Sequence, residues 1–201
     1  MPTSATPRRI GLYGGSFDPV HLGHLLVAQA ACEELKLDRL FFVPAAQSPF
    51  KPGTQPAPAA LRLRWLRLAL ANCANYEVDD QEVHRGGVSF TIDTVRGYAS
   101  RFPEAALYYL IGADHVRKLP QWRAAEELAG LLEFVVIPRP GEASAAAPAP
   151  FRLHRLRGFP VAVSSSVIRA RCREGLCIRH LVPPGVGEAI RETRVYSGTA
   201  N

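Results

Sequence analysis

Short apolar runs alternate with segments of helical periodicity along most of the chain. The apolar runs predict strands at residues 8–13, 39–45, 76–83, 106–111 and 133–137. Apolar positions three or four residues apart predict helices at residues 22–35, 59–71, 91–100 and 165–174, the last closed by Gly175. Strands that alternate with helices form β-α-β units, so we expect an α/β protein with an open, mostly parallel sheet and helices on both faces.

The predicted helix over residues 59–71 has one apolar face and several arginines. Its apolar face should be buried and is formed by Leu61, Trp65 and Leu68. Its other sides should carry the arginines Arg62, Arg64 and Arg67.

Two segments interrupt the alternation of strands and helices. Residues 51–60 (KPGTQPAPAA) and 141–150 (GEASAAAPAP) are rich in proline and alanine and lack periodicity, which is typical of mobile surface loops. Neither segment is long enough to separate two domains. We therefore expect one domain over residues 1–201, with residues 1–8 as a flexible tail.

The composition fits a globular protein, with 47% hydrophobic and 21% charged residues in a chain of 201. No apolar run approaches the length of about 18 residues that a transmembrane helix needs, and the N-terminus lacks the apolar core of a secretory signal. We expect a soluble, cytoplasmic protein without a membrane partner.

The four cysteines contain no C-x-x-C pair, so we expect reduced and mostly buried thiols. Cys172, Cys177 and His180 lack the fourth ligand that a structural zinc site requires.

The formal net charge is +6, with a sequence pI near 9.5. That balance favours an anionic partner, which could be nucleic acid, a membrane surface or a small phosphorylated molecule. The charge alone does not decide among these classes.

The densest group of chemically capable residues is the string GGSFDPVHLGH at residues 14–24, between the first predicted strand and the first predicted helix. In an open α/β sheet, ligands bind at the carboxyl ends of the strands. The glycines allow close backbone approach, and the helix N-terminus offers N–H groups to an anion. His21 and His24 are three residues apart, so on a helix they share a face and can donate hydrogen bonds to phosphate oxygens.

Other interpretations of the same string fit less well. A dinucleotide fingerprint needs G-x-G-x-x-G, which this string lacks. A serine hydrolase needs G-x-S-x-G, but Asp18 stands where the second glycine would be. A metal site needs a third ligand beside His21 and His24, and Asp18 could serve, but histidines at a glycine-rich helix start suit phosphate better.

The string resembles the signature G-x-F-D-P-x-H-x-G-H of a nucleotidyltransferase superfamily, at residues 15–24. Further segments narrow the resemblance to the bacterial nicotinate-nucleotide adenylyltransferase family. They are PAAQSPFK at 44–51, RGGVSFTIDT at 85–94, GAD at 112–114, LPQW at 119–122, RPG at 139–141 and SSSVIR at 164–169. The resemblance extends from about residue 10 to residue 196, and the motifs follow the family's order.

The resemblance implies a Rossmann-like nucleotidyltransferase fold and a reaction in NAD biosynthesis. ATP and nicotinate mononucleotide would give nicotinate adenine dinucleotide and pyrophosphate, through in-line attack of the mononucleotide's 5′-phosphate on the α-phosphorus of ATP. That nucleophile is largely deprotonated at neutral pH, so positioning and charge neutralisation would suffice. Mg²⁺ is expected with ATP, held by phosphate oxygens and water, and no protein ligand for it can be named.

The resemblance also implies site residues. Catalytic roles in stabilising phosphate charge fall to His21, His24 and Arg169. ATP would be bound by Gly14, Gly15, Ser16, Phe17, His21, His24, Gly112, Asp114, Ser165, Ser166 and Arg169. The mononucleotide would be bound by Lys51, Thr91 and Trp122, and Arg123, which stands where the family commonly has an aromatic residue, is a further candidate of this chain.

Several of these assignments have a purely structural alternative. Ser165 and Ser166 could cap a helix, as could Asp114, and Trp122 could belong to the core. Arg123 could pair with the substrate carboxylate or face solvent. The chain also departs from the family pattern, since Phe50 replaces a histidine, Phe90 replaces a tyrosine and Arg123 replaces an aromatic residue.

Alternative functions remain at this point. The nicotinamide mononucleotide could be the preferred substrate, and phosphopantetheine adenylyltransferases are a related but poorer match. A nucleic-acid-binding module would fit the charge and the basic segment FRLHRLR at 151–157, but the arginines are spread along the chain instead of forming a stripe. We therefore expect no nucleic-acid partner. The sequence leaves open whether the chain forms homo-oligomers.

Overall fold

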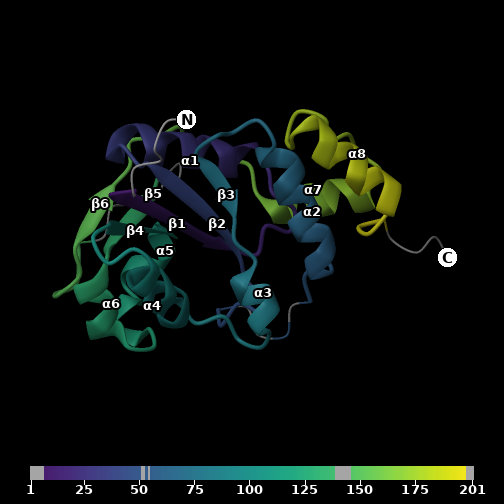
Figure 1. Cartoon of the computed structure of the whole chain (residues 1–201). Helices are drawn as coiled ribbons and strands as arrows, with labels where there is room; N and C mark the ends of the chain where they lie inside the picture. The colour runs from purple at the N-terminus through teal and green to yellow at the C-terminus, as the bar shows by residue number, and fades with distance from the viewer. Residues whose placement is uncertain (1–6, 51–52, 54, 139–145, 198–201) are drawn as a thin grey trace.

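The computed structural model describes residues 7–50, 53, 55–138 and 146–197. Six parallel strands form one open sheet in the order β3-β2-β1-β4-β5-β6 (Figure 1). Their bounds are Arg9–Gly15 for β1, Arg39–Pro44 for β2, Tyr76–Val78 for β3, Ala106–Gly112 for β4, Glu133–Ile137 for β5 and Leu153–Arg155 for β6. The predicted Rossmann-like architecture is confirmed, with every described pair of strands parallel.

Helices cover both faces of the sheet, as predicted (Figure 1). One face carries α1 (Leu22–Leu35), α2 (Ala59–Leu70), α7 (Ser165–Arg173) and α8 (Pro184–Thr193). The other face carries α4 (Thr91–Arg101), α5 (Ala113–Val116) and α6 (Ala125–Leu131). The short helix α3 (Gln81–Arg85) precedes α4, and a 3₁₀ turn, η1 (Leu119–Gln121), follows α5.

The alternation of side chains along β2 shows why both faces need cover. Leu40 and Phe42 belong to the core beneath α1 and α2, whereas Phe41 and Val43 belong to the core beneath α4. Each of these side chains is at most 2% exposed. Successive strand residues point to opposite faces, so an apolar run such as RLFFVP requires a helix layer on each side. Burial of one such side chain stabilises the fold by about 1.5–3 kcal/mol.

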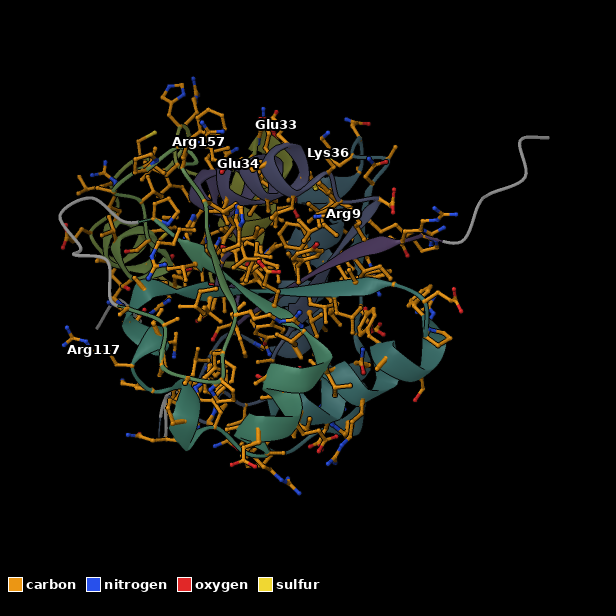
Figure 2. The ribbon with its side chains drawn as sticks, turned by 90° about the vertical axis from the view of Figure 1, so that its left-hand side faces the viewer. Arg9, Glu33, Glu34, Lys36, Arg117 and Arg157 are labelled. Carbon is orange, nitrogen blue, oxygen red and sulfur yellow. The ribbon has the colours of Figure 1, made fainter. Side chains whose placement is uncertain are left out.

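Polar contacts fix the direction of α1 relative to the sheet. The Glu34 carboxylate accepts hydrogen bonds from the backbone N–H groups of Arg157 (3.0 Å) and Gly158 (2.9 Å), beyond β6. Figure 2 shows Glu34 and Arg157 beside one another on the outer side of α1. At the end of the helix, Arg9 Nε donates to the Leu35 carbonyl at 2.6 Å. These contacts fix the C-terminal end of α1, and its N-terminus lies at the carboxyl end of β1.

Most predicted elements are confirmed, including α1 and β5 with their bounds. The prediction of a strand over residues 76–83 is wrong beyond Val78, where Asp79 Oδ1 accepts the Gln81 N–H at 3.0 Å and α3 begins. The elements α5, η1, α6, β6 and α8 had no counterpart in the prediction. Gly175 has φ +68, which agrees with its expected left-handed conformation after α7.

The prediction for the arginines of α2 is wrong in one instance. Arg62 is only 2% exposed, while Arg64 and Arg67 lie outside and form surface ion pairs. On the expected apolar face, Trp65 is fully buried but Leu68 is 41% exposed. The helix is therefore rotated so that a guanidinium group, instead of a leucine, enters the interior.

Expectations for the loops and cysteines are corrected in part. Ala57 is buried and Ala59 begins α2, so residues 55–60 are not a plain surface loop. Residues 146–150 of the second segment are mainly exposed. Cys177 is exposed and the other cysteines are half-buried, so the prediction of mostly buried thiols is wrong, although all four are free. No helix among the described residues combines the length and the apolar character needed to span a bilayer.

Candidate active site

A cleft of about 1540 Å³ opens at the carboxyl ends of β1, β2 and β4. The strand order reverses between β1 and β4, which makes this position the topological switch point of the sheet. The ends of these strands contribute Gly14, Gly15 and Gly112 to the cleft wall. The fold thus places the motif at residues 14–24 where open α/β sheets bind ligands.

The loop after β1 is shaped by close packing. A Cβ at position 14 would lie 2.2 Å from Tyr109 Oη, so any residue other than glycine would require the buried Tyr109 ring to move. Phe17 adopts φ +47, which is unusual for a residue with a side chain, and its ring is 1% exposed. That ring packs edge-on against Tyr13 at a centroid distance of 5.5 Å. The Phe17 side chain therefore anchors the loop in the core, and any contact of this residue with ATP falls to its backbone.

The two imidazoles of the motif lie together at the N-terminus of α1. His21 occupies the N-cap position, and its ring centroid is 3.7 Å from that of His24. His24 Nδ1 accepts the His21 backbone N–H at 3.2 Å, so in the neutral imidazole the proton is on Nε2, which can donate to a ligand. A Cβ at Gly23 would lie 3.0 Å from the His21 ring. The glycine between the histidines therefore allows the His21 ring to lie close across the start of the helix.

His21 is electrically neutral at pH 7 in the free protein. Its side chain is 6% exposed, and burial lowers its pKa to about 4. Within the described part of the chain, its Nδ1 atom is buried and has no hydrogen-bond partner. Such a nitrogen is stabilised when a ligand supplies the partner. His21 therefore provides a hydrogen-bonding nitrogen instead of a permanent positive charge.

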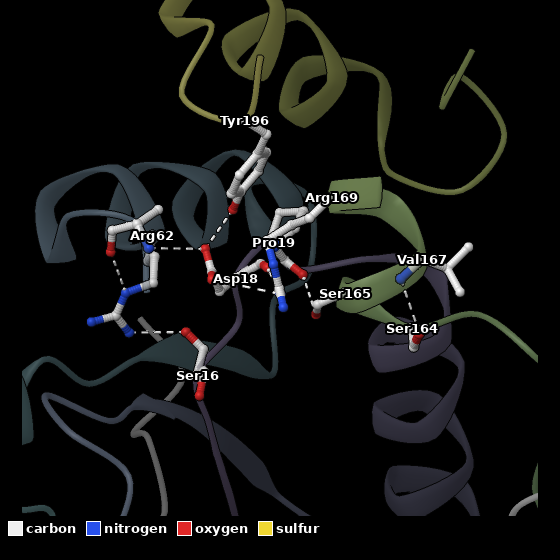
Figure 3. A network of polar contacts seen from close by, with 10 residues as sticks. Ser16, Asp18, Pro19, Arg62, Ser164, Ser165, Val167, Arg169 and Tyr196 are labelled. Atoms are coloured by element: carbon white, nitrogen blue, oxygen red, sulfur yellow. Dashed lines mark hydrogen bonds and ion pairs between the residues drawn. The ribbon is translucent and has the colours of Figure 1, made fainter. Parts of the chain in front are cut away.

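Arg169 of α7 reaches the loop between β1 and α1 (Figure 3). Its Nη1 donates to the Asp18 carbonyl at 2.7 Å and lies 3.6 Å from Asp18 Oδ2. Ser165 Oγ donates to the Pro19 carbonyl at 2.9 Å. These contacts bring the start of α7 against the motif that opens α1. The sequence segments 14–24 and 164–169, far apart in the chain, thus form one wall of the cleft.

The capping alternative for the serines of α7 is wrong. Ser164 is the N-cap residue and accepts the Val167 N–H at 3.3 Å. Ser165 is instead bonded to Pro19, and Ser166 is exposed at the cleft. Ser16 also lines the cleft. Ser166 is thus not occupied as the cap of α7 and lines the cleft.

Thr91 and Trp122 line the cleft from the opposite side of the sheet. Thr91 is the first residue of α4, and its Oγ1 donates to Tyr109 Oη at 3.4 Å. The Trp122 ring is half-buried and packs against Phe134 at 5.7 Å and Phe50 at 5.4 Å. Trp122 therefore belongs to the core and to the cleft wall at once, so the two interpretations of this residue are compatible.

Two predicted site residues, Asp114 and Arg123, lie outside the cleft lining. Asp114 is the second residue of α5 behind the N-cap Gly112, so the capping alternative is wrong for it, and it does not line the cleft. The Arg123 guanidinium lies 4.8 Å from the centre of the Phe90 ring and 3.7 Å from Asp93, and it is also outside the lining. Lys51 lies outside the described residues, as does the RPG segment.

Sequence reasoning missed several residues of the cleft. Glu82 lines it and is 4% exposed, accepting a hydrogen bond from Thr94, and burial raises the pKa of its carboxyl. It went unnoticed because its segment resembles a strand. Ser89 Oγ accepts the Ala46 N–H at 3.0 Å and joins two lining loops. His115 lies 4.8 Å from the Phe50 ring, and its position directly after the GAD motif was an available signal.

Comparison with protein-family models matches residues 12–171 to the cytidylyltransferase-like family. A protein of Opitutus terrae described as a probable nicotinate-nucleotide adenylyltransferase is 42% identical over 191 residues, covering 94% of this chain and 97% of its own. A Shouchella clausii protein with the same description is 41% identical, with the same coverage. The chain belongs to the nicotinate-nucleotide adenylyltransferase family. This membership confirms the resemblance drawn from the motifs.

Comparison with solved structures finds the same fold in other proteins. The nicotinic acid mononucleotide adenylyltransferase of Plasmodium falciparum, complexed with NaAD, is similar with a TM-score of 0.78 and 19% identity, covering 94% of this chain and 97% of that one. A protein of Vibrio parahaemolyticus is similar with a TM-score of 0.70 and 18% identity, covering 96% of this chain and 97% of that one. At this identity the likeness concerns the fold.

Among the described residues, no group of three His, Cys, Asp or Glu side chains is arranged to hold a metal ion.

Proposed function

We propose that the protein transfers the adenylyl group of ATP to nicotinate mononucleotide, forming nicotinate adenine dinucleotide and pyrophosphate in NAD biosynthesis. The observation that carries the proposal is the pair of imidazoles at the start of α1, 3.7 Å apart, at the switch point of the sheet. The family membership and the relatives' described activity support the choice of substrates.

The cleft is built to receive several negative charges. The N-termini of α1, α4 and α7 are all represented in its lining, by Gly23, Thr91 and Ser165. A helix N-terminus presents unpaired N–H groups and the positive end of the helix dipole. Arg169 adds a permanent positive charge between α7 and the loop after β1. Such a set of donors suits a triphosphate and a phosphate monoester bound side by side.

The residues contribute positioning and charge stabilisation to the reaction. His24 Nε2 and His21 would donate hydrogen bonds to phosphate oxygens as negative charge develops in the transition state. A bound triphosphate favours the protonated form of His21, which is neutral in the free protein. Arg169 and the serines at the start of α7 would hold the departing pyrophosphate. The attacking phosphate needs no base, so the buried Glu82 has no required part in proton transfer.

Mg²⁺ is expected to accompany ATP, coordinated by phosphate oxygens and water, and it offsets part of the charge of the triphosphate. The nicotinate carboxylate would be received at the opposite end of the cleft. The N–H groups in the first turn of α4, next to Thr91, suit this anion, and the Trp122 ring suits the pyridine. Arg123 is an unsuitable partner for the carboxylate in this geometry because it lies near Asp93.

The decisive experiment measures pyrophosphate release and dinucleotide formation. Purified protein is incubated with Mg-ATP and either nicotinate or nicotinamide mononucleotide. The proposal predicts turnover with both ATP and nicotinate mononucleotide present, at a much higher kcat/KM than with the nicotinamide form. Equal kcat/KM for the two mononucleotides would refute the preference for nicotinate, and no turnover with either would refute the reaction.

The nucleic-acid alternative loses its main support in the structure. The basic segment at 151–157 contains the edge strand β6, and its aromatic Phe151 is 6% exposed. A buried ring cannot stack on bases. Tight oligonucleotide binding that weakens steeply with salt would revive this alternative.

A further inference from the structure

The end of the chain returns to the motif near its start. Tyr196, three residues beyond α8, donates a hydrogen bond from its hydroxyl to Asp18 Oδ1 (Figure 3). The side chain is 9% exposed, and its ring packs against Trp65 of α2 at a centroid distance of 5.7 Å. Tyr196 also lines the cleft. Residues separated by 178 positions are therefore joined at the edge of the proposed phosphate site.

The contacts of Asp18 divide its carboxylate into two halves. Oδ1 accepts the Tyr196 hydroxyl and the Ala57 N–H, the latter at 3.1 Å. Oδ2 lies 3.6 Å from Arg169 Nη1. The Asp18 side chain is 10% exposed, so water has little access to replace a lost donor. The donors on Oδ1 thus determine which way Oδ2 faces.

The position of Arg169 depends on this arrangement. Its Nη1 is shared between the Asp18 carbonyl and the nearby Oδ2, which leaves the other N–H groups of the guanidinium for a ligand. If the Tyr196 hydroxyl is removed, Oδ1 keeps only the Ala57 N–H. The carboxylate can then rotate towards Arg169 and form the two-pronged pair that arginine and carboxylate favour. Such a pair would use N–H groups that the phosphates require.

We propose that Tyr196 is a positioning residue for the pyrophosphate end of the cleft, acting through Asp18 on Arg169. The inference rests on the proposed function for the identity of the anion. It assigns a role to the segment after α8, which none of the sequence motifs includes. Burial and the hydrogen bond to Asp18 raise the pKa of the Tyr196 hydroxyl, so the residue remains a donor throughout the ordinary pH range.

The chain offers a matched control. Tyr98 also donates its hydroxyl to a carboxylate, that of Asp79, and is 1% exposed. Burial raises the pKa of this hydroxyl as well, and neither Tyr98 nor Asp79 lines the cleft. Tyr196→Phe and Tyr98→Phe therefore remove the same kind of hydrogen bond and keep the ring. They should lower the melting temperature by similar amounts, but only the first should change the phosphate site.

The test measures binding of inorganic pyrophosphate by calorimetry, together with steady-state kinetics. For Tyr196→Phe, we expect the Kd for pyrophosphate and the KM for ATP to rise about tenfold, as loss of a charge-assisted contact commonly produces. The KM for nicotinate mononucleotide should change less than the KM for ATP. Tyr98→Phe should match the wild type in all of these quantities. The change must also depend on Arg169, so adding Tyr196→Phe to an Arg169→Lys variant should weaken pyrophosphate binding by much less than tenfold.

Each outcome decides the inference. Tyr196→Phe that binds pyrophosphate like the wild type overturns it, as does an equal loss in Tyr98→Phe or a full tenfold loss in the Arg169→Lys background. A wild type that binds no pyrophosphate also overturns it. Calorimetry needs no turnover. A protein that binds pyrophosphate but forms no dinucleotide would therefore refute the proposed function, and the pyrophosphate affinities of the variants would still test the role of Tyr196. If Tyr196→Phe does not fold, Tyr196→His replaces it, and its pyrophosphate binding is measured with and without Arg169→Lys. If the two substitutions weaken pyrophosphate binding additively, the inference is overturned.

Discussion

The buried imidazole of His21 gives the protein a stability that depends on pH. Burial lowers its pKa to about 4, compared with 6.5 for an exposed histidine. Between these values the unfolded chain binds a proton at this position and the folded protein does not, so acidification favours unfolding. Well above pH 6.5 both states carry a neutral imidazole and the stability does not depend on this group, whereas the stability falls progressively as the pH drops from about 7 towards 4.

The size of the effect follows from the two pKa values. Between pH 7 and pH 5, protonation of the unfolded chain alone removes about 2 kcal/mol from the free energy of unfolding. His21→Asn keeps a polar side chain of similar size but does not titrate. The difference in the free energy of unfolding between wild type and variant should therefore change by about 2 kcal/mol over this interval, with the wild type losing more stability on acidification.

Urea unfolding at pH 7, 6 and 5, followed by circular dichroism, measures both proteins under identical conditions. Other titrating groups affect the wild type and the variant alike, so the difference isolates position 21. Parallel curves, with a difference that stays constant from pH 7 to pH 5, would refute the reasoning that His21 is buried in its neutral form. The same imidazole should titrate at a higher pH when ATP is bound, because the triphosphate favours its protonated form.

Other predictions follow from particular contacts. His24→Ala should lower kcat by about 10²–10³-fold with an unchanged circular dichroism spectrum, and a loss under tenfold would count against its role as a phosphate donor. Arg62→Met leaves the carbonyls of Ser16, Ala45 and Ala57 without their donor, so it should cost about 3–5 kcal/mol in urea unfolding, whereas the surface variant Arg64→Met should cost under about 0.5 kcal/mol. A small loss for Arg62→Met would mean that the buried guanidinium does not hold these loops. Phe50→Ala should raise the KM for nicotinate mononucleotide about 2–10-fold through its lost contact with Trp122 and leave the KM for ATP unchanged, and an unchanged mononucleotide KM would contradict this.

Local signals in the sequence predict the part of the site that is local in the chain. The string at residues 14–24 contains its own turn, its own helix start and its own histidine spacing, and periodicity alone gives the bounds of α1. The strand pattern places this string at the carboxyl end of a strand, which is where open α/β sheets bind ligands. Motif order identifies the family, because several short segments match together.

Contacts between distant segments could not be predicted in the same way. Arg62 has the spacing of a surface residue on α2, and only the carbonyls of Ser16 and Ala45 explain its burial. Tyr196 belongs to none of the sequence motifs, and its hydrogen-bond partner Asp18 lies near the other end of the chain. Such positions depend on how loops meet in three dimensions, which periodicity does not report.

Short elements were missed for a related reason. Helix α8 begins at the second of two consecutive prolines, Pro183 and Pro184, and contains Gly185 and Gly187, a composition typical of a loop. Val186 and Ile190 nevertheless bury its inner face against the core. Helix α3 has only one and a half turns, so its periodicity is too brief to distinguish it from the strand before it. In both cases tertiary packing decides the structure against weak local preference.

The central claim is that the two imidazoles at the start of α1 stabilise the phosphates during adenylyl transfer to nicotinate mononucleotide. Its most direct test is the rate of nicotinate adenine dinucleotide formation, measured by chromatography, for the wild type and the double variant His21→Ala/His24→Ala. The account predicts rapid formation by the wild type and a loss of at least about 10³-fold in a folded double variant. A double variant that forms the dinucleotide at close to the wild-type rate would contradict it.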